Sequence, residues 1–324
     1  MPTNDFLYLS RAEVEQVGLD MRSIIRLLEE AFREKGNGRV EMPPKPGIHP
    51  LPDAFIHAMP AYIPAMRSAG IKWVSGYPAN ASRGLPYISG LLILNDPETG
   101  IPIAVMDCTW ITAQRTAAAT ALSAKYLARG DSETVGILAC GVQGRTNLEA
   151  LACTFKVRKV YAYDILPAVQ ERYVAEMGEK LSLEIVGVKE ARQAVVDADL
   201  IVTSGPILKH PQPTIEKGWL RPGTFASAVD FDSYFSGAAM AQMDRVCTDD
   251  QAQFLFYKTA GYFQETPLPY ADLGELVAGV KPGRQSAQER CMAINLGLAM
   301  DDMAVAPTIL RLAREKGLGR MLPL

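Results

Sequence analysis

One stretch of the chain, residues 134–164, constrains the fold more than any other. It opens with a short apolar run, continues through a turn that contains Gly141 and Gly144 and a segment of helical periodicity, and closes with a second apolar run before Asp164. Strand, glycine turn, helix and strand with an acidic residue at its end is the arrangement of a dinucleotide-binding βαβ unit. The stretch therefore predicts a doubly wound parallel α/β sheet with a nucleotide site at the turn.

The turn is one glycine short of the usual pattern. Gly141 allows backbone N–H groups to approach a pyrophosphate closely, and Gly144 allows the helix to pack closely on the strand. Ala139, however, stands where the first glycine is usual. Because glycine-rich turns also join strands and helices that bind nothing, the turn alone is a weak indication of a nucleotide.

Asp164 strengthens the case for a cofactor. A carboxylate about 20 residues beyond the turn can accept hydrogen bonds from both adenosine ribose hydroxyls, and it repels a 2′-phosphate. No arginine follows at once, since the next residues are Ile165, Leu166 and Pro167. We therefore expect NAD rather than NADP. The residues assigned to the cofactor are Gly141, Val142, Gln143, Gly144 and Asp164, with Thr203 and Ser204 at the end of a later strand.

Length and composition bound the class of protein. A chain of 324 residues is long enough for two domains, and 48% apolar with 21% charged residues is ordinary for a soluble enzyme. The net charge of −3 offers no field for nucleic acid or an anionic membrane, and no apolar run reaches membrane-spanning length. No signal peptide is visible, and five scattered cysteines without C-x-x-C spacing are typical of a cytoplasmic protein. No cluster has metal-site spacing, so we expect no metal.

The rest of the chain predicts a second kind of architecture beside the parallel sheet. Residues 69–107 read as three consecutive strands, which indicates an antiparallel sheet or a small open barrel. An alanine-rich helix over 111–128 leads into the nucleotide stretch, and strands alternate with helices, including one over 190–196, beyond it. Near the end, 291–306 and 307–316 read as two helices, followed by a tail.

Several motifs, taken together and in order, resemble the ornithine cyclodeaminase/mu-crystallin family. They are GIKWVSGYPAN, RGLPYISGLLILNDPETGIPIAVMD, TWITAQRTAAATALSAKYLA, ACGVQG and DLGELVAGVKPGR. The resemblance implies an α+β substrate and dimerisation domain over 1–115, joined by a C-terminal helix within 303–324, and a Rossmann domain over 116–302. It also implies a homodimer. Family members include ornithine cyclodeaminases, archaeal-type alanine dehydrogenases and reductases of cyclic ketimines and imino acids.

The resemblance also assigns site residues. Lys72 matches the lysine that binds the substrate carboxylate, Arg115 matches the arginine at the RTAA helix start, and Lys45 falls where many members have another carboxylate-binding arginine. Asp232 aligns with the catalytic aspartate. The set is chemically coherent, because cations hold an α-carboxylate and a carboxyl group in a dry pocket can exchange a proton with the substrate nitrogen.

Two departures from the family pattern bear on function. The segment after Asp232 reads SYFSGAAM in place of the usual Pro-Gly-Lys-x-Glu-Leu-like run, which leaves Asp230 as a rival carboxylate. His57 stands where ornithine cyclodeaminases carry a glutamate for the distal amino group. A histidine does not attract a second ammonium, so we expect an amino or imino acid other than ornithine.

Each of these residues also has a purely structural interpretation. A lone lysine in a strand, such as Lys72, is usually solvent-facing, and Arg115 at a helix start is ordinarily in a surface ion pair. Asp232 after a strand is most often a cap or turn residue, and His57 between apolar residues is most often structural.

The sequence as a whole predicts a cytoplasmic, NAD-dependent oxidoreductase that moves hydride between nicotinamide and the α-carbon of an amino or imino acid. Lys72, Arg115 and Lys45 would bind the substrate carboxylate, and His57 would lie near the substrate side chain. Asp232 would donate a proton to the imine nitrogen or, in the reverse direction, activate water or the amine. Two alternatives stay open: cyclodeamination, in which NAD is recycled, and a catalytically silent binding protein. The sequence does not identify the substrate.

Overall fold

The chain divides into two structural units, and the computed structural model describes residues 5–324. Unit 1 comprises Met1–Arg115 and Leu298–Leu324, and unit 2 comprises Thr116–Gly297. The second boundary therefore lies a few residues before the position 302 chosen from the sequence.

Unit 1 is built on one open sheet of seven strands. Their order is β15-β1-β6-β5-β4-β3-β2; β1 and β6 pair in parallel, and all the other neighbours are antiparallel. The strands are β1 (Asp5–Leu9), β2 (Gly47–Ile48), β3 (Phe55–Ile63), β4 (Ser68–Gly76), β5 (Ile88–Asn95), β6 (Pro102–Asp107) and β15 (Arg320–Pro323). The antiparallel meander predicted over 69–107 is confirmed. The predicted tail is wrong in part, because β15 pairs with β1 along Asp5–Tyr8.

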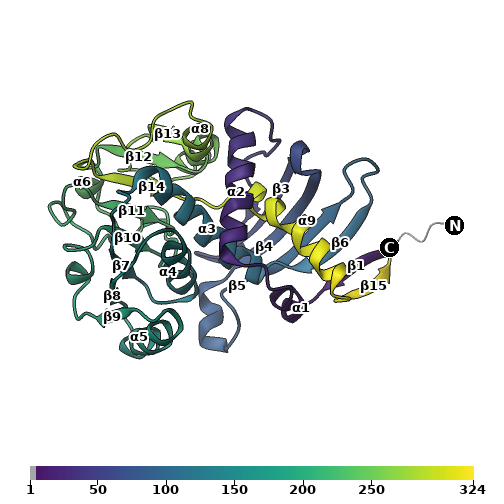
Figure 1. Cartoon of the computed structure of the whole chain (residues 1–324), viewed down its shortest axis with the longest axis horizontal. Helices are drawn as coiled ribbons and strands as arrows, with labels where there is room; N and C mark the ends of the chain where they lie inside the picture. Colours follow the sequence, from purple (N-terminus) through teal and green to yellow (C-terminus); the bar gives the residue numbers. More distant parts are fainter. Residues whose placement is uncertain (1–4) are drawn as a thin grey trace. The chain divides into compact units, whose positions relative to one another are not determined.

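Helices cover one face of this sheet (Figure 1). α9 packs on β3 and β4, and α2 packs on α9. The helical elements of unit 1 are α1 (Arg11–Gln16), α2 (Met21–Gly36), the short 3₁₀ turns η1 (Pro64–Met66) and η2 (Pro78–Arg83), α9 (Ala299–Glu315) and the first part of α3 (Thr109–Leu127). Alternation in β4 places Ser68, Lys72 and Val74 among the buried residues, whereas Trp73 is half exposed.

The prediction of two helices divided at Pro307 is wrong, because α9 runs through this proline. A proline in a helix has no N–H for the carbonyl four residues earlier, which here belongs to Met303. The buried hydroxyl of Ser68, on β4, donates to that carbonyl at 2.7 Å. The hydrogen bond that Pro307 removes is thus replaced from the sheet, and α9 continues.

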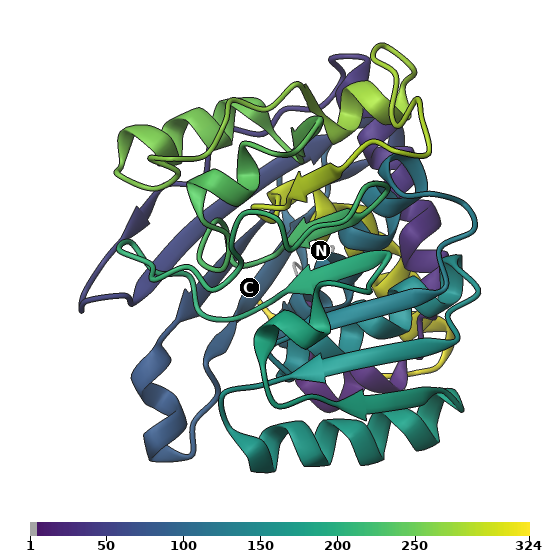
Figure 2. The ribbon, with the colours of Figure 1, turned by 90° about the vertical axis from the view of Figure 1, so that its left-hand side faces the viewer.

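Unit 2 is an eight-stranded sheet in which every pair of neighbours is parallel (Figure 2). The order is β13-β12-β14-β11-β10-β7-β8-β9. The strands are β7 (Thr134–Leu138), β8 (Lys159–Tyr163), β9 (Glu184–Gly187), β10 (Leu200–Thr203), β11 (Phe225–Ala228), β12 (Arg245–Thr248), β13 (Ala271–Asp272) and β14 (Cys291–Ile294). Strand order reverses between β7 and β10, so the predicted doubly wound, Rossmann-type fold is confirmed.

The secondary structure of unit 2 differs from the prediction at several places. Its helical elements are the rest of α3, α4 (Val142–Thr154), α5 (Pro167–Leu181), η3 (Ala191–Ala194), α6 (Gly237–Met240), α7 (Gln251–Thr259) and α8 (Leu273–Val277). The helix predicted over 190–196 is only the 3₁₀ turn η3, and α6 and α7 were not predicted. The start of the helix predicted over 291–306 is the central strand β14, whose four residues are all buried. A short run that is apolar throughout has no period that distinguishes a strand from a helix.

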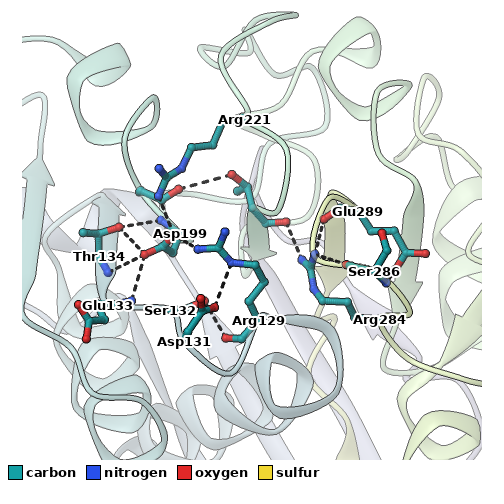
Figure 3. Close-up of polar contacts among 12 residues, drawn as sticks. Arg129, Asp131, Ser132, Glu133, Thr134, Asp199, Arg221, Arg284, Ser286 and Glu289 are labelled. Carbon is teal, nitrogen blue, oxygen red and sulfur yellow. Dashed lines mark hydrogen bonds and ion pairs between the residues drawn. The ribbon is translucent and has the colours of Figure 1, made fainter.

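Asp199 ties together the amino ends of the central strands (Figure 3). It lies just before β10 and accepts hydrogen bonds from the N–H and hydroxyl of Thr134, at the start of β7, and from the guanidinium groups of Arg129 and Arg221. Arg284, from the KPGR segment, donates to the carbonyls of residues 127 and 224 in the same region. These contacts fix the amino edge of the sheet.

Candidate functional site

All the residues assigned to the cofactor lie at the ends of strands of unit 2, at the carboxyl edge of its sheet. The glycine turn follows β7, Asp164 follows β8, Thr203 is the last residue of β10, and Ser204 comes directly after it. β7 and β10 are the strands between which the order reverses. In open parallel sheets, ligands bind outside the carboxyl ends of the strands at this position.

The glycine turn has the geometry that close approach of a phosphate requires. A Cβ built on Gly141 would meet no atom within 4 Å, so protein packing does not demand glycine there. The N–H groups of Val142 and Gln143 open helix α4, where they have no acceptor within the helix. A Cβ on Gly144, in contrast, would lie 2.4 Å from the Ala139 carbonyl oxygen, so this glycine serves helix–strand packing.

Ala139 adopts the backbone conformation of the glycine that it replaces. Its φ is +75°, in the left-handed region that L side chains avoid. The conformation is held at both ends, because its N–H donates to the Tyr163 carbonyl at 2.9 Å and its carbonyl accepts from the Ser204 hydroxyl at 3.1 Å. The turn is therefore complete in shape although it is one glycine short in sequence.

Asp164 is joined to the glycine turn. One of its carboxylate oxygens accepts from the N–H of Cys140 at 2.8 Å, and the other accepts from the N–H of Leu166 at 2.9 Å. The side chain is only partly buried. Each oxygen has a second lone pair, so the carboxylate can still accept a ribose hydroxyl. Burial raises the pKa of the Cys140 thiol to about 12, so it stays protonated.

Asp230 bridges the ends of β10 and β11. Its fully buried carboxyl accepts from the Thr203 hydroxyl at 2.8 Å and from the N–H of Gly205 at 2.9 Å. Burial raises the pKa of Asp230 to about 7. Thr203, which we assign to the cofactor, therefore also donates a hydrogen bond to a buried aspartate.

Asp232 lies two residues further along the chain and is also buried. It is 9% exposed and accepts from the Thr266 hydroxyl at 3.1 Å. Burial raises its pKa, which favours the protonated form. Phe231, between the two aspartates, has a φ of +62° and packs against Tyr257, Tyr262 and Phe263. The sequence interpretation did not single out Thr266 or these rings, because they lie far along the chain.

In unit 1, Lys72 is a buried residue, which rules out the solvent-facing interpretation. Its side chain is 0% exposed, and its Nζ lies 2.6 Å from Asp302 and donates to the Thr112 hydroxyl at 3.2 Å. Burial lowers the pKa of Lys72, the charge of Arg115 lowers it further, and Asp302 opposes both effects.

Arg115, on α3, is buried in the same cluster rather than in a surface ion pair. Its Nε lies 3.3 Å from Asp302, and a terminal nitrogen lies 3.6 Å from Asp301. Both aspartates are fully buried in the first turn of α9. The sequence interpretation missed them, because acidic residues in a first helical turn are ordinary.

His57 and Lys45 complete the cationic side of unit 1. His57 lies on β3, on the same face of the sheet as Lys72, and Lys45 lies in the proline-rich segment before β2; both are buried. The ring of His57 stacks on Phe55 at 4.3 Å. Burial, reinforced by the charges of Lys45, His49 and Lys72, lowers the pKa of His57 to about 3. The imidazole is therefore neutral.

Each unit thus assembles its own half of the predicted residues: Lys45, His57, Lys72 and Arg115 cluster in unit 1, and the cofactor residues, Asp230 and Asp232 lie at one sheet edge of unit 2. Within residues 5–324, no group of three or more His, Cys, Asp and Glu side chains is placed to hold a metal ion. None of the helices described here is long and apolar enough to cross a membrane.

Comparison with known proteins gives matches over almost the whole chain. A family model described as the ornithine cyclodeaminase/mu-crystallin family matches residues 5–317. An alanine dehydrogenase of Archaeoglobus fulgidus is 34% identical over 329 residues, covering 97% of each chain. The structure of Thermococcus litoralis Δ1-pyrroline-2-carboxylate reductase in complex with NADH and L-proline has a TM-score of 0.89 at 33% identity, covering 97% of this chain and 99% of that one. A dimer of an archaeal alanine dehydrogenase with bound NAD has a TM-score of 0.88 at 32% identity, covering 99% of each chain.

Proposed function

Because the chain belongs to the ornithine cyclodeaminase/mu-crystallin family, we propose that it is an NAD-dependent oxidoreductase that transfers hydride between nicotinamide and the α-carbon of an amino or imino acid. The buried cation cluster around Lys72 is the observation that carries this proposal, since a site for an α-carboxylate needs such a cluster. The reductase and dehydrogenases to which the chain is similar support the reaction type.

NAD is the cofactor, and the carboxyl edge of unit 2 fits it. Gly141, Val142 and Gln143 present backbone N–H groups and open space to the pyrophosphate. Asp164 accepts from the adenosine ribose, and Thr203 and Ser204 line the neighbouring strand end. Bound NAD or NADH supplies the hydride acceptor or donor.

The substrate carboxylate is held by Lys72, Arg115 and Lys45. His57, neutral over the whole physiological range, lines the side-chain end of the pocket. A neutral imidazole beside Lys45 and Lys72 offers no anion for a distal ammonium. The enzyme therefore acts on an amino or imino acid with an uncharged side chain, as L-proline and alanine have, rather than on ornithine.

Asp232 exchanges the proton of the substrate nitrogen. Burial raises the pKa of Asp232, which favours the protonated form that can donate to an imine as the imine accepts hydride. In the reverse direction the carboxylate takes the proton from the amine or activates water. Asp230 stays a rival for this role, and the variant Asp230→Asn tests it beside Asp232→Asn.

The test follows NADH absorbance with Δ1-pyrroline-2-carboxylate, a larger cyclic ketimine, and pyruvate with ammonia. We expect oxidation of NADH with at least one of them. Lys72→Ala and Asp232→Asn should lower turnover about a hundredfold or more while NADH binding, followed by fluorescence, stays intact. Proline made from ornithine without net NADH oxidation would establish cyclodeamination instead. NADH binding without turnover of any substrate would establish a binding protein.

The chain also forms a homodimer and resides in the cytoplasm under this proposal. The outer face of the unit 1 sheet carries exposed apolar side chains, and the archaeal alanine dehydrogenase to which the chain is similar is dimeric. Within the described residues none of the five cysteines forms a disulfide, which suits a reducing compartment.

A further inference from the structure

The contacts of Asp302 join the two cations that we assign to the substrate carboxylate. Its two oxygens are divided between them, with Oδ2 at 2.6 Å from Nζ of Lys72 and Oδ1 at 3.3 Å from Nε of Arg115. All three side chains are at least nine-tenths buried. A single carboxylate therefore fixes the spacing of an ammonium that comes from β4 and a guanidinium that comes from α3.

The two cations differ in how they meet acidic and hydroxyl oxygens. Nζ of Lys72 forms an ion pair with Asp302 at 2.6 Å and donates to the Thr112 hydroxyl at 3.2 Å. Arg115 donates its Nε–H to Asp302, and one of its terminal nitrogens lies 3.6 Å from Asp301. An ammonium and a planar guanidinium are the groups with which proteins bind carboxylates.

The position of Asp302 is itself fixed by the packing of α9. Ser68 donates to the carbonyl of Met303, the next residue after Asp302, and a Cβ built on Gly70 would lie 3.0 Å from the Met303 sulfur. Ser68, Gly70 and Lys72 alternate along one face of β4. The strand that carries the lysine thus also holds the helix turn that carries its partner.

We propose that Asp302 is a positioning residue that orients Lys72 and Arg115 toward the substrate carboxylate. The proposal rests on the proposed function, because it assigns to these cations the carboxylate of an amino or imino acid. Asp302 does not touch the substrate. Its effect reaches the substrate through the lysine and the arginine.

The charges around Lys72 show how this role can be measured. Burial of the site and the charge of Arg115 lower the pKa of Lys72, and Asp302 raises it. Burial raises the pKa of Cys108 to about 11, so its thiol adds a charge only at high pH. His57 is neutral and adds no charge. Removing the charge of Asp302 therefore lowers the pKa of Lys72 further, and binding that needs the ammonium is lost at a lower pH.

The experiment compares Asp302→Asn, Asp302→Glu and the matched control Asp301→Asn. Each is assayed for KM and kcat with the substrate that the wild type reduces, across pH, and for NADH affinity by fluorescence. We expect Asp302→Asn to raise KM about tenfold or more and to move the alkaline limb of kcat/KM to lower pH. Asp302→Glu keeps the negative charge but moves it by one methylene. KM should therefore rise, while the alkaline limb of the kcat/KM profile should stay at the pH of the wild type.

Asp301→Asn should leave the alkaline limb unchanged, because the ion pair of Asp301 is with Arg115, at 3.6 Å. NADH affinity should be the same in all variants, which shows that they are folded. An unchanged KM and pH limb in Asp302→Asn would overturn the proposal. The proposal would also be overturned if Asp301→Asn and Asp302→Asn raised KM equally and neither shifted the alkaline limb of kcat/KM. If Asp302→Asn does not fold, an unchanged KM in Asp302→Glu overturns it.

Calorimetric binding of L-proline and L-alanine, with NADH present, separates this proposal from the proposed function. One outcome is that the wild type binds these compounds but turns over no substrate, and that Asp302→Asn binds them more weakly. This outcome would contradict the proposed function but support the positioning role of Asp302. A wild type that neither binds nor turns over any of these compounds would overturn both.

Discussion

Ala139 stores backbone strain at the first position of the glycine turn. An L side chain in the left-handed region costs about 1–2 kcal/mol, whereas glycine there costs only its extra chain entropy, about 0.5–1 kcal/mol. Ala139→Gly should therefore stabilise the protein by about 0.5–1 kcal/mol. The measurement is the free energy of unfolding from denaturant titration of the apo protein.

Ala162 is the matched control for this change. It is a buried alanine in β8, a regular strand, where glycine should destabilise by about 0.5–1 kcal/mol. The two substitutions remove the same methyl group and should have opposite signs. Destabilisation by Ala139→Gly as large as that of Ala162→Gly would show that the left-handed alanine carries no strain.

The residue scale also shows where prediction from the sequence stops. The glycine spacing and Asp164 were readable, because a local motif contains them. The role of Asp302 could not be predicted, because it depends on an ion pair with Lys72, which lies far earlier in the chain. An aspartate in the first turn of a helix gives no indication of such a partner. Asp230 was noted only as a rival carboxylate, and its bonds to Thr203 and Gly205 required the structure.

At the scale of elements, α9 depends on one hydroxyl of the neighbouring strand. Ser68→Ala removes the donor to the Met303 carbonyl and leaves that carbonyl buried without its replacement bond, which should cost about 1–3 kcal/mol. Pro307→Ala restores a main-chain N–H at the position that normally serves this carbonyl. The cost of Ser68→Ala should therefore be smaller in a Pro307→Ala background than in the wild type.

A double-mutant cycle measured by denaturant unfolding checks this coupling. Additive effects of Ser68→Ala and Pro307→Ala would mean that the hydroxyl does not substitute for the lost helix bond. Ser75→Ala is a control on the same strand, since its hydroxyl bonds within the sheet to Ser89 rather than to α9, and its cost should not depend on residue 307.

Elements with a clear period were predictable, and elements defined by their partners were not. The meander over 69–107 and the βαβ unit have turns and periods of their own, so their class followed from the residues. β14 is a uniformly apolar run that becomes a strand because β11 and β12 pair with it on either side. β15 exists through its pairing with β1, at the opposite end of the chain.

At the scale of the whole molecule, unit 1 has an apolar sheet face that its helices leave uncovered. Trp73 on β4 lies directly opposite Leu91 on β5, and they are 49% and 44% exposed, with Tyr62 on β3 at 36%. Large exposed apolar residues that share one face of a sheet typically mark an interface. We assign this face to the proposed homodimer.

A charge in the centre of this face should disrupt the homodimer, because a carboxylate buried at an interface without a partner is strongly unfavourable. Trp73→Glu should weaken dimerisation about a hundredfold or more, which light scattering and sedimentation detect as a shift from two chains to one. The control Leu268→Glu makes a comparable change at a residue of unit 2 that is 67% exposed, and it should leave the mass of the particle in solution unchanged.

A Trp73→Glu protein that stays as dimeric as the wild type would place the interface elsewhere. A monomeric wild type would remove the homodimer from the proposal. Since the inner face of the same sheet carries Lys72 and His57, a monomeric but folded Trp73→Glu variant also reveals whether turnover needs the assembled dimer.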